Sequence, residues 1–269
     1  MRILFLGGGN MATALIGGLL QQGFKPAELR VIDVSEQARQ LLQQKFGVTV
    51  GAAPDGAIAE DAVVLAVKPQ QMRAAAMELR AVLSGQLVIS IAAGIRTTDL
   101  SRWLGGHDRI VRAMPNTPAL IRSGISGLYA TTSLKQADRD SAQTILGAVG
   151  GSIWVQDESD LDVVTAVSGS GPAYVFYFIE ALERAAVELG LTEGQAHELA
   201  VQTFVGAAKL AAASEEPVAV LRARVTSKAG TTEAALKSME AGEIRRKIGH
   251  AVRAAAERSK QLGDEFGEE

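Results

Sequence analysis

The sequence of 269 residues contains no cysteine and only three histidines, His107, His197 and His250, which are far apart in the chain. The absence of cysteine excludes disulfides, thiolate zinc sites, iron–sulfur clusters and cysteine nucleophiles. The scattered histidines predict that there is no metal site either. Any catalysis is therefore expected to depend on other residue types or on a bound cofactor.

Long apolar runs and an excess of positive charge are also missing. No uninterrupted stretch of about 18 apolar residues occurs, so a membrane-spanning helix is not expected. The apolar N-terminal segment is broken by Gly7-Gly8-Gly9-Asn10 and lacks an Ala-x-Ala cleavage site, unlike a signal peptide. The formal net charge of −3 argues against a protein that coats nucleic acid or anionic lipid. We therefore expect a cytoplasmic protein that binds neither nucleic acid nor membrane.

Up to about residue 155, short apolar runs alternate with amphipathic segments. The apolar runs predict strands at residues 3–6, 29–32, 62–67, 87–91, 110–114, 127–131 and 152–155. The amphipathic segments predict helices at residues 11–22, 36–46, 70–83, 97–104 and 135–149. Near-continuous apolar strands that alternate with helices are typical of a parallel sheet covered on both faces. This half is predicted to be an α/β domain with a doubly wound, mostly parallel sheet.

After about residue 156 the strand pattern stops, and the periodicity predicts helices only. These are expected at residues 161–189, 193–213, 217–224, 233–241 and 243–262. Gly190 and Gly242 are predicted to end helices, and Thr192 with Gln195 forms a capping-box pattern. We therefore expect one domain over residues 1–155 and an all-α domain over residues 156–269.

The segment 172–182, PAYVFYFIEAL, is apolar around nearly its whole circumference as a helix. A helical domain of roughly 110 residues has little core in which to bury such a helix. The segment is therefore predicted to be buried between subunits of a homo-oligomer.

A glycine-rich turn directly follows the first predicted strand and opens a helix. Its Gly-x-Gly-x-x-Ala pattern is formed by Gly7, Gly9 and Ala12. The first glycine suits the tight turn, the second lets backbone approach a pyrophosphate, and the third small residue lets helix and strand pack closely. The helix N-terminus then offers free N–H groups to phosphates. The context predicts a dinucleotide site rather than a plain glycine turn.

Asp33 ends the second predicted strand, where an acidic side chain commonly bonds the adenosine ribose 2′-hydroxyl. It could instead cap the following helix, with Ser35 as a rival for that role. No arginine follows Asp33 directly, and the nearest in the next helix is Arg39. The choice between NADH and NADPH stays open at this point.

Three further loops, at residues 66–69, 90–94 and 114–118, follow predicted strands of the same sheet. Ligands of open α/β sheets bind beyond the carboxyl ends of strands. Each loop by itself could be a structural turn, but three together favour a ligand site. The candidate residues are Val67, Lys68, Pro69, Ala92, Ala93 and Asn116.

Two polar segments stand out in the helical half. Ser168-Gly169-Ser170-Gly171 interrupts a long apolar helix, which indicates either close approach of a ligand or tight packing. Residues 226–233, TSKAGTTE, open a helix and carry the hydroxyls of Ser227, Thr231 and Thr232. Free N–H groups beside these hydroxyls suit a small carboxylate. A plain N-cap would explain only one of the hydroxyls.

The motifs GGGNMA, AVKP, SIAAG, RAMPNTPA, AVSGSGPAY and VTSKAGTTEAALKSME, in this order, resemble the pyrroline-5-carboxylate reductase family over about residues 2–262. The resemblance implies a Rossmann-type N-terminal domain and an all-α C-terminal dimerisation domain that forms a homodimer, often assembled into larger oligomers. It implies reduction of the cyclic imine 1-pyrroline-5-carboxylate to L-proline, with NADPH or NADH as cofactor.

Site residues carry over by motif. Those implied for the cofactor are Gly7, Gly9, Asn10, Met11, Ala12, Lys68, Pro69, Ala92, Ala93 and Asn116. Those implied for the substrate are Ser227, Gly230, Thr231, Thr232 and the acidic Glu158. Family members often have Pro-Gly or Pro-Asn where this chain has Lys228-Ala229, so its loop loses a rigidifying proline.

A protonated iminium is already strongly electrophilic, so no lysine or histidine has to polarise it. Residues 167–174 contain no lysine, whereas hydroxy-acid dehydrogenases of similar architecture place a catalytic lysine on the comparable helix. We expect Thr232 to be catalytic through a hydrogen bond to the ring nitrogen. The Ser227 hydroxyl and the Gly230 and Thr231 amides are expected to hold the carboxylate.

Two other functions are considered. The first is a different imine or hydroxy-acid dehydrogenase of the same architecture, against which the missing lysine and the loop 227–232 both weigh. The second is a non-catalytic dinucleotide sensor, which would be expected to have a degraded substrate loop.

Overall fold

The computed structural model describes residues 1–54 and 56–268 and divides into two compact units. The first unit contains Met1–Ser170 together with the end of the chain from Ala255, and the second contains Gly171–Ala254. This division differs from the expected boundary at residue 155. The reason lies in α6 (Asp160–Val164), which packs on the sheet so closely that a Cβ on Gly127 would lie 2.6 Å from Val164. The separation of cofactor binding from substrate binding and dimerisation stays a prediction.

The first unit is built on one eight-stranded sheet with the strand order β3-β2-β1-β4-β5-β6-β7-β8. All neighbouring strands are parallel except β6 and β7, which are antiparallel, so the predicted doubly wound, mostly parallel sheet is confirmed. Strand β3 was not predicted, because three residues are too short to produce a pattern. The strands are β1 (Ile3–Leu6), β2 (Leu29–Ile32), β3 (Thr49–Gly51), β4 (Ala62–Leu65), β5 (Leu87–Ser90), β6 (Ile110–Met114), β7 (Gly124–Ala130) and β8 (Gly150–Trp154).

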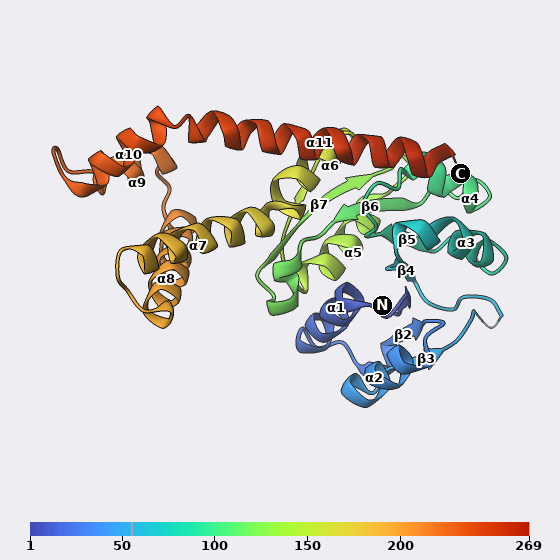
Figure 1. Ribbon diagram of the computed structural model, residues 1–269. Helices are drawn as coiled ribbons and strands as arrows, with labels where there is room; N and C mark the ends of the chain where they lie inside the picture. The colour runs from blue at the N-terminus through green and yellow to red at the C-terminus, as the bar shows by residue number, and fades with distance from the viewer. Residues whose placement is uncertain (55, 269) are drawn as a thin grey trace. The chain divides into compact units, whose positions relative to one another are not determined.

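Both faces of this sheet are covered by helices (Figure 1). In β1, Ile3 and Phe5 point to one apolar cluster, whereas Leu4 and Leu6 point to the other. Helices α1 (Asn10–Gln21), α2 (Glu36–Phe46) and α5 (Gln136–Gly147) contribute to the first cluster, and α3 (Pro69–Arg80) and α4 (Thr97–Trp103) to the second. Short 3₁₀ turns occur at η1 (Pro26–Glu28) and η2 (Thr117–Ile121). Burial on both faces explains why the strands are apolar throughout.

The helix predicted over residues 161–189 is interrupted. After α6 the chain makes a π-helical turn, η3 (Thr165–Gly169), in which Ser170 N–H donates to the Thr165 carbonyl at 2.8 Å, and α7 (Gly171–Glu188) follows. A Cβ on Gly169 would lie 2.6 Å from Met114 Cε, so this glycine permits tight packing on the end of β6. Pro172 lies in the first turn of α7, where its missing N–H is tolerated.

The second unit is helical, with α7, α8 (Glu193–Ala213), α9 (Val218–Arg224), α10 (Thr231–Ala241) and the beginning of α11 (Ile244–Glu268). The predicted capping box is confirmed, because Gln195 N–H donates to Thr192 Oγ1 and Thr192 N–H to the Gln195 side chain. Gly190 ends the preceding helical segment with φ +103°, and Gly242 caps α10. Among the described residues, none of the helices combines the length and the apolar character needed to cross a membrane.

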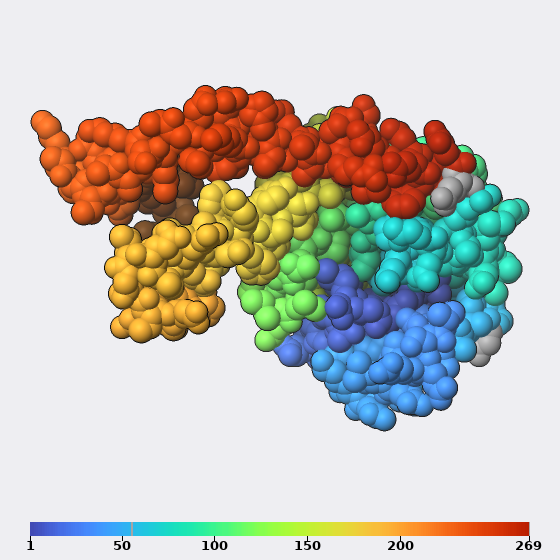
Figure 2. Space-filling model, viewed as in Figure 1, coloured from blue at the N-terminus to red at the C-terminus, as the bar shows by residue number. Residues whose placement is uncertain are grey.

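The second unit has almost no core of its own. Within residues 171–254, all of which the structure describes, only Ala196 and Ala200 are buried hydrophobic residues. The α7 residues Phe176 and Tyr177 are 67% and 69% exposed. The segment formed by α7 and α8, yellow to orange in Figure 2, lies at the surface. A single copy of the chain therefore leaves the apolar residues of this unit in contact with water.

Candidate functional site

The glycine turn after β1 has the geometry that its sequence predicts. Gly7 has φ +101°, and a Cβ there would lie 2.7 Å from the Ala66 carbonyl oxygen, so only glycine fits. Its N–H donates to the Ile32 carbonyl at 2.7 Å. The middle glycine also packs closely, because a Cβ on Gly8 would lie 2.7 Å from Leu42 Cδ1 in α2 and would require that side chain to shift. The turn therefore lies between the end of β4 and the middle of α2.

Gly9 caps α1 and faces open space, since a Cβ there would meet no described atom within 4 Å. The first N–H of this helix to find a backbone acceptor is that of Thr13, which donates to Gly9 O at 2.9 Å. The N–H groups of Asn10, Met11 and Ala12 are thus available at the positive end of the helix dipole, while the Ala12 side chain is buried. This arrangement fits a pyrophosphate.

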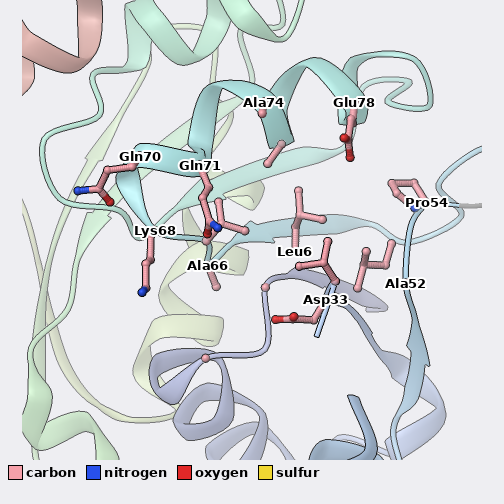
Figure 3. Close-up of a pocket in the computed structure, with 16 residues that line it drawn as sticks. Leu6, Asp33, Ala52, Pro54, Ala66, Lys68, Gln70, Gln71, Ala74 and Glu78 are labelled. Atoms are coloured by element: carbon pink, nitrogen blue, oxygen red, sulfur yellow. The ribbon is translucent and has the colours of Figure 1, made fainter. Parts of the chain in front are cut away.

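A cavity of about 450 Å³ lies at the carboxyl ends of β1, β2 and β4 (Figure 3). It brings together five predicted cofactor residues: Gly7, Gly9, Asp33, Val67 and Lys68. Ligands of doubly wound sheets bind where the strand order reverses, which here is next to β1. The position of the cavity therefore agrees with a dinucleotide site.

The other eleven described residues that line the cavity were not predicted as site residues: Leu6, Ile32, Val34, Ala52, Pro54, Ala66, Gln70, Gln71, Ala74, Ala75 and Glu78. Four of them follow helical spacing along α3, namely Gln71, Ala74, Ala75 and Glu78. The two small residues Ala74 and Ala75, on a face of α3 beside its buried Met72 and Leu79, were the signal that could have identified this wall.

Asp33 is anchored beside the glycine turn by two backbone amides. Gly8 N–H donates to Asp33 Oδ2 at 2.6 Å, and Ser35 N–H donates to Oδ1 at 2.7 Å. The cap of α2 is Ser35, whose Oγ accepts a hydrogen bond from Ala38 N–H, so the alternative role of Asp33 as a helix cap is wrong. Arg39 Nη1 donates to the carbonyls of Asp33 and Val34, at 2.7 and 3.0 Å.

The structure places Lys68 and Pro69 at the start of α3, with Lys68 as its cap and Pro69 as its first residue. Ala92, Ala93 and Asn116 lie at the same edge of the sheet but do not line the cavity. The Asn116 side chain donates to Ser168 O at 3.2 Å and accepts from Ile125 N–H at 2.9 Å. It therefore fastens the loop after β6, and contacts of these residues with a nicotinamide remain a prediction.

Glu158 is occupied by contacts within the first unit. Its Oε1 accepts from Thr97 N–H at 2.7 Å and lies 3.0 Å from Arg112 Nη1, while its Oε2 accepts from the Thr97 hydroxyl at 2.7 Å. The same Arg112 lies 4.0 Å from Asp162, which accepts from the Ser259 hydroxyl. These contacts support the start of α4, and a contact of Glu158 with substrate stays untested. Among the described residues, no group of three or more acidic or histidine side chains could hold a metal ion.

The loop 227–232 lies in the second unit and leads into α10, which Gly230 caps. A Cβ on Gly230 would collide with Ser227 Oγ, so glycine lets this hydroxyl lie over the helix start. The Gly230 N–H already donates to Ser227 O at 3.1 Å, so the amides left for a carboxylate begin with Thr231. Within the described residues, the hydroxyls of Ser227, Thr231 and Thr232 make no hydrogen bond.

Ala229 adopts a left-handed conformation with φ +58°, which an alanine rarely takes. Its N–H donates to the Glu233 carboxylate at 2.5 Å, which pins the loop to the first turn of α10. This is the position where the family resemblance leads one to expect glycine or asparagine. In this chain an alanine therefore holds a left-handed backbone conformation that glycine or asparagine would adopt more easily.

Two family models match the chain. Residues 158–262 match pyrroline-5-carboxylate reductase dimerisation, and residues 2–94 match NADP oxidoreductase, coenzyme F420-dependent. The first match covers the helical region with the loop 227–232. The second covers the glycine turn and the first strands of the sheet.

Full-length relatives agree with these matches. The chain is 46% identical to pyrroline-5-carboxylate reductase of Pseudomonas aeruginosa, over 99% of this chain and 98% of that protein. The solved pyrroline-5-carboxylate reductase of Coxiella burnetii superposes with a TM-score of 0.92 at 43% identity, covering 97% and 98% of the two chains. The Plasmodium falciparum pyrroline carboxylate reductase with NADP bound gives a TM-score of 0.85 at 30% identity, with 98% of both chains covered. The chain belongs to the pyrroline-5-carboxylate reductase family.

Proposed function

We propose that this chain reduces 1-pyrroline-5-carboxylate to L-proline by hydride transfer from NAD(P)H, the last step of proline biosynthesis. The observation that carries the proposal is the loop 227–232, with three hydroxyls that make no hydrogen bond among the described residues and an open helix start behind them. A glycine turn is common to many dinucleotide enzymes, whereas this loop offers a neutral cradle for a small carboxylate. The named relatives at up to 46% identity support the same reaction.

The glycine turn and the cavity beside it fit a nicotinamide dinucleotide. Gly9 and the first N–H groups of α1 would hold the pyrophosphate, and Asp33 would lie at the adenosine ribose. We assign the nicotinamide end to Lys68, Pro69, Ala92, Ala93 and Asn116. When bound, the reduced nicotinamide supplies the hydride.

On the substrate side, we assign the carboxylate to the Ser227 hydroxyl and the Thr231 and Thr232 amides. The Thr232 hydroxyl is then the group that hydrogen-bonds the ring nitrogen, where the positive charge resides. Catalysis by the chain itself consists mainly of orientation, which can lower a barrier by roughly 7–11 kcal/mol. Glu158 is assigned a positioning role through Thr97 and Arg112, because both of its carboxylate oxygens are engaged there.

We also propose that the functional unit is a homodimer formed through the helical region. The exposed Phe176 and Tyr177 on α7 and the near absence of a core in the second unit support this. Light scattering coupled to size-exclusion chromatography should give a molar mass of at least two copies of the chain. The same mass gives the number of dimers in any larger assembly. An active monomer at micromolar concentration would contradict the proposal. A cytoplasmic location is part of the proposal.

The test of the function is steady-state oxidation of NADH and of NADPH with 1-pyrroline-5-carboxylate, beside 2- and 3-hydroxy acids assayed in the oxidative direction. We expect turnover with the cyclic imine only. Turnover with a hydroxy acid instead would indicate the alternative dehydrogenase. Cofactor binding without turnover of any imine would indicate a dinucleotide sensor.

A further inference from the structure

The dinucleotide cavity has two ends that differ in charge. Asp33 follows β2 and Lys68 follows β4, and β1 lies between these two strands in the sheet. Figure 3 shows the two side chains apart, with Lys68 on the side of β4 and Asp33 on the side of β2. The adenosine ribose of a dinucleotide with its pyrophosphate on the glycine turn belongs at the end of β2. The ribose would therefore meet the carboxylate and not the lysine.

The Asp33 carboxylate is fixed in one orientation. The amides of Gly8 and Ser35 hold its two oxygens at 2.6 and 2.7 Å, one from the glycine turn and one from the start of α2. A carboxylate has about four acceptor sites, so each oxygen can still accept a hydroxyl. A ribose 2′-hydroxyl can donate to it, whereas a 2′-phosphate would bring about −1.5 to −2 charges against it.

No cation at this end of the cavity balances such a phosphate among the described residues that line it. Among the described lining residues, Lys68 is the only cation, and Glu78 adds a second carboxylate beside Asp33. Arg39 lies next to the loop, but its Nη1 donates to the carbonyls of Asp33 and Val34 and it does not line the cavity. To receive a 2′-phosphate, Arg39 would have to turn its remaining N–H donors, on Nε and Nη2, into a cavity that it does not line.

The geometry points to NADH as the preferred hydride donor of this chain, with Asp33 as the residue that discriminates against NADPH. This inference rests on the proposed function and concerns the adenosine end of the same site. The Asp33 carboxylate would select NADH in two ways. It would accept a hydrogen bond from the ribose 2′-hydroxyl of NADH, and its charge would repel the 2′-phosphate of NADPH.

The experiment compares kcat/KM for NADH and NADPH with 1-pyrroline-5-carboxylate as substrate, together with dissociation constants of NAD⁺ and NADP⁺ measured by calorimetry without imine. We expect NADH to be favoured by about tenfold or more, the ratio that one charged hydrogen bond corresponds to. Asp33→Asn keeps the size of the side chain and one acceptor oxygen but removes the charge. It should lower the NADH to NADPH ratio by about tenfold, with tighter NADP⁺ binding as part of the change.

The matched control is Glu36→Gln, which removes an equal charge from the first turn of α2, outside the cavity lining. It should leave the ratio unchanged. A wild-type preference for NADPH, or an equal shift in Glu36→Gln and Asp33→Asn, would overturn the inference. If Asp33→Asn does not fold, the wild-type protein still decides, because added salt should then improve NADP⁺ binding relative to NAD⁺. The calorimetric arm needs no imine turnover, so failure of the proposed reaction and failure of this inference give different results.

Discussion

The guanidinium of Arg112 lies 3.0 Å from the Glu158 carboxylate, and only 6% of the Arg112 side chain is exposed. Arg112 belongs to β6, and Glu158 precedes α6. Because the same carboxylate accepts two hydrogen bonds from Thr97, the pair links the middle of the sheet to the start of α4. Thr97 begins that helix, four residues after Ala93. The ion pair therefore supports the segment between β5 and α4, which carries the predicted cofactor residues Ala92 and Ala93.

Replacing Arg112 by methionine should destabilise the protein by about 3 kcal/mol, because it leaves the Glu158 charge poorly solvated without its cation. Urea unfolding of the wild type and the variant measures this. The double variant Arg112→Met with Glu158→Gln should recover part of the loss, since no uncompensated charge then remains. A loss below about 1 kcal/mol in the single variant would contradict a structural role for the pair.

Asp138 should make stability depend on acid pH. Burial opposes ionisation of this carboxyl, but hydrogen bonds from Arg109 at 2.6 Å and from Lys135 N–H at 3.1 Å outweigh burial and lower its pKa. A lowered pKa in the folded state gives stability that is present above the unfolded value of about 4 and is lost as the pH falls through the folded value. Arg109→Gln should therefore be less stable than wild type near about pH 7, and the difference should shrink below about pH 4. Unfolding curves across this range test it, and a difference that does not change with pH would contradict it.

Ala229→Gly should stabilise the protein. The left-handed backbone of Ala229, with φ +58°, costs an alanine roughly 1 kcal/mol that glycine does not pay. After the larger chain entropy of glycine in the unfolded state is included, we expect a gain of about 0.5 kcal/mol in the free energy of unfolding. The matched control is Ala234→Gly inside α10, which should cost about 1 kcal/mol. Equal effects of the two changes would show that the loop backbone relaxes away from this conformation.

Thr232→Ala should lower kcat/KM for the imine by about one to two powers of ten, the loss expected for one hydrogen bond to a charged group. Thr232→Ser keeps the hydroxyl and should retain most of the activity. Ser238→Ala, an exposed hydroxyl on the same helix, serves as the control and should behave as wild type. Unchanged steady-state kinetics in Thr232→Ala would refute the role of this hydroxyl.

The parts of the structure that could be predicted are those governed by neighbours in the chain. The strands of the sheet alternate with helices, the glycine turn lies where Gly7 is required, and the Thr192 capping box forms as expected. Strand β3 was missed because three residues show no periodicity, and its pairing with β2 is a long-range contact. The continuous helix expected from residue 161 is interrupted at η3, where Gly169 packs against Met114, a residue of β6 that is distant in the sequence.

The α/β class, the dinucleotide turn, the loop 227–232 and the family all follow from the amino-acid order, because each rests on local spacing and on residue types with few conformational alternatives. Only the tertiary structure decides which polar groups already form hydrogen bonds within the chain. In the folded chain the Glu158 carboxylate accepts hydrogen bonds from Thr97 and Arg112, and the Asp33 carboxylate accepts them from the amides of Gly8 and Ser35. Hydrogen bonds between distant segments depend on how the sheet and its loops pack together, and no local pattern records them.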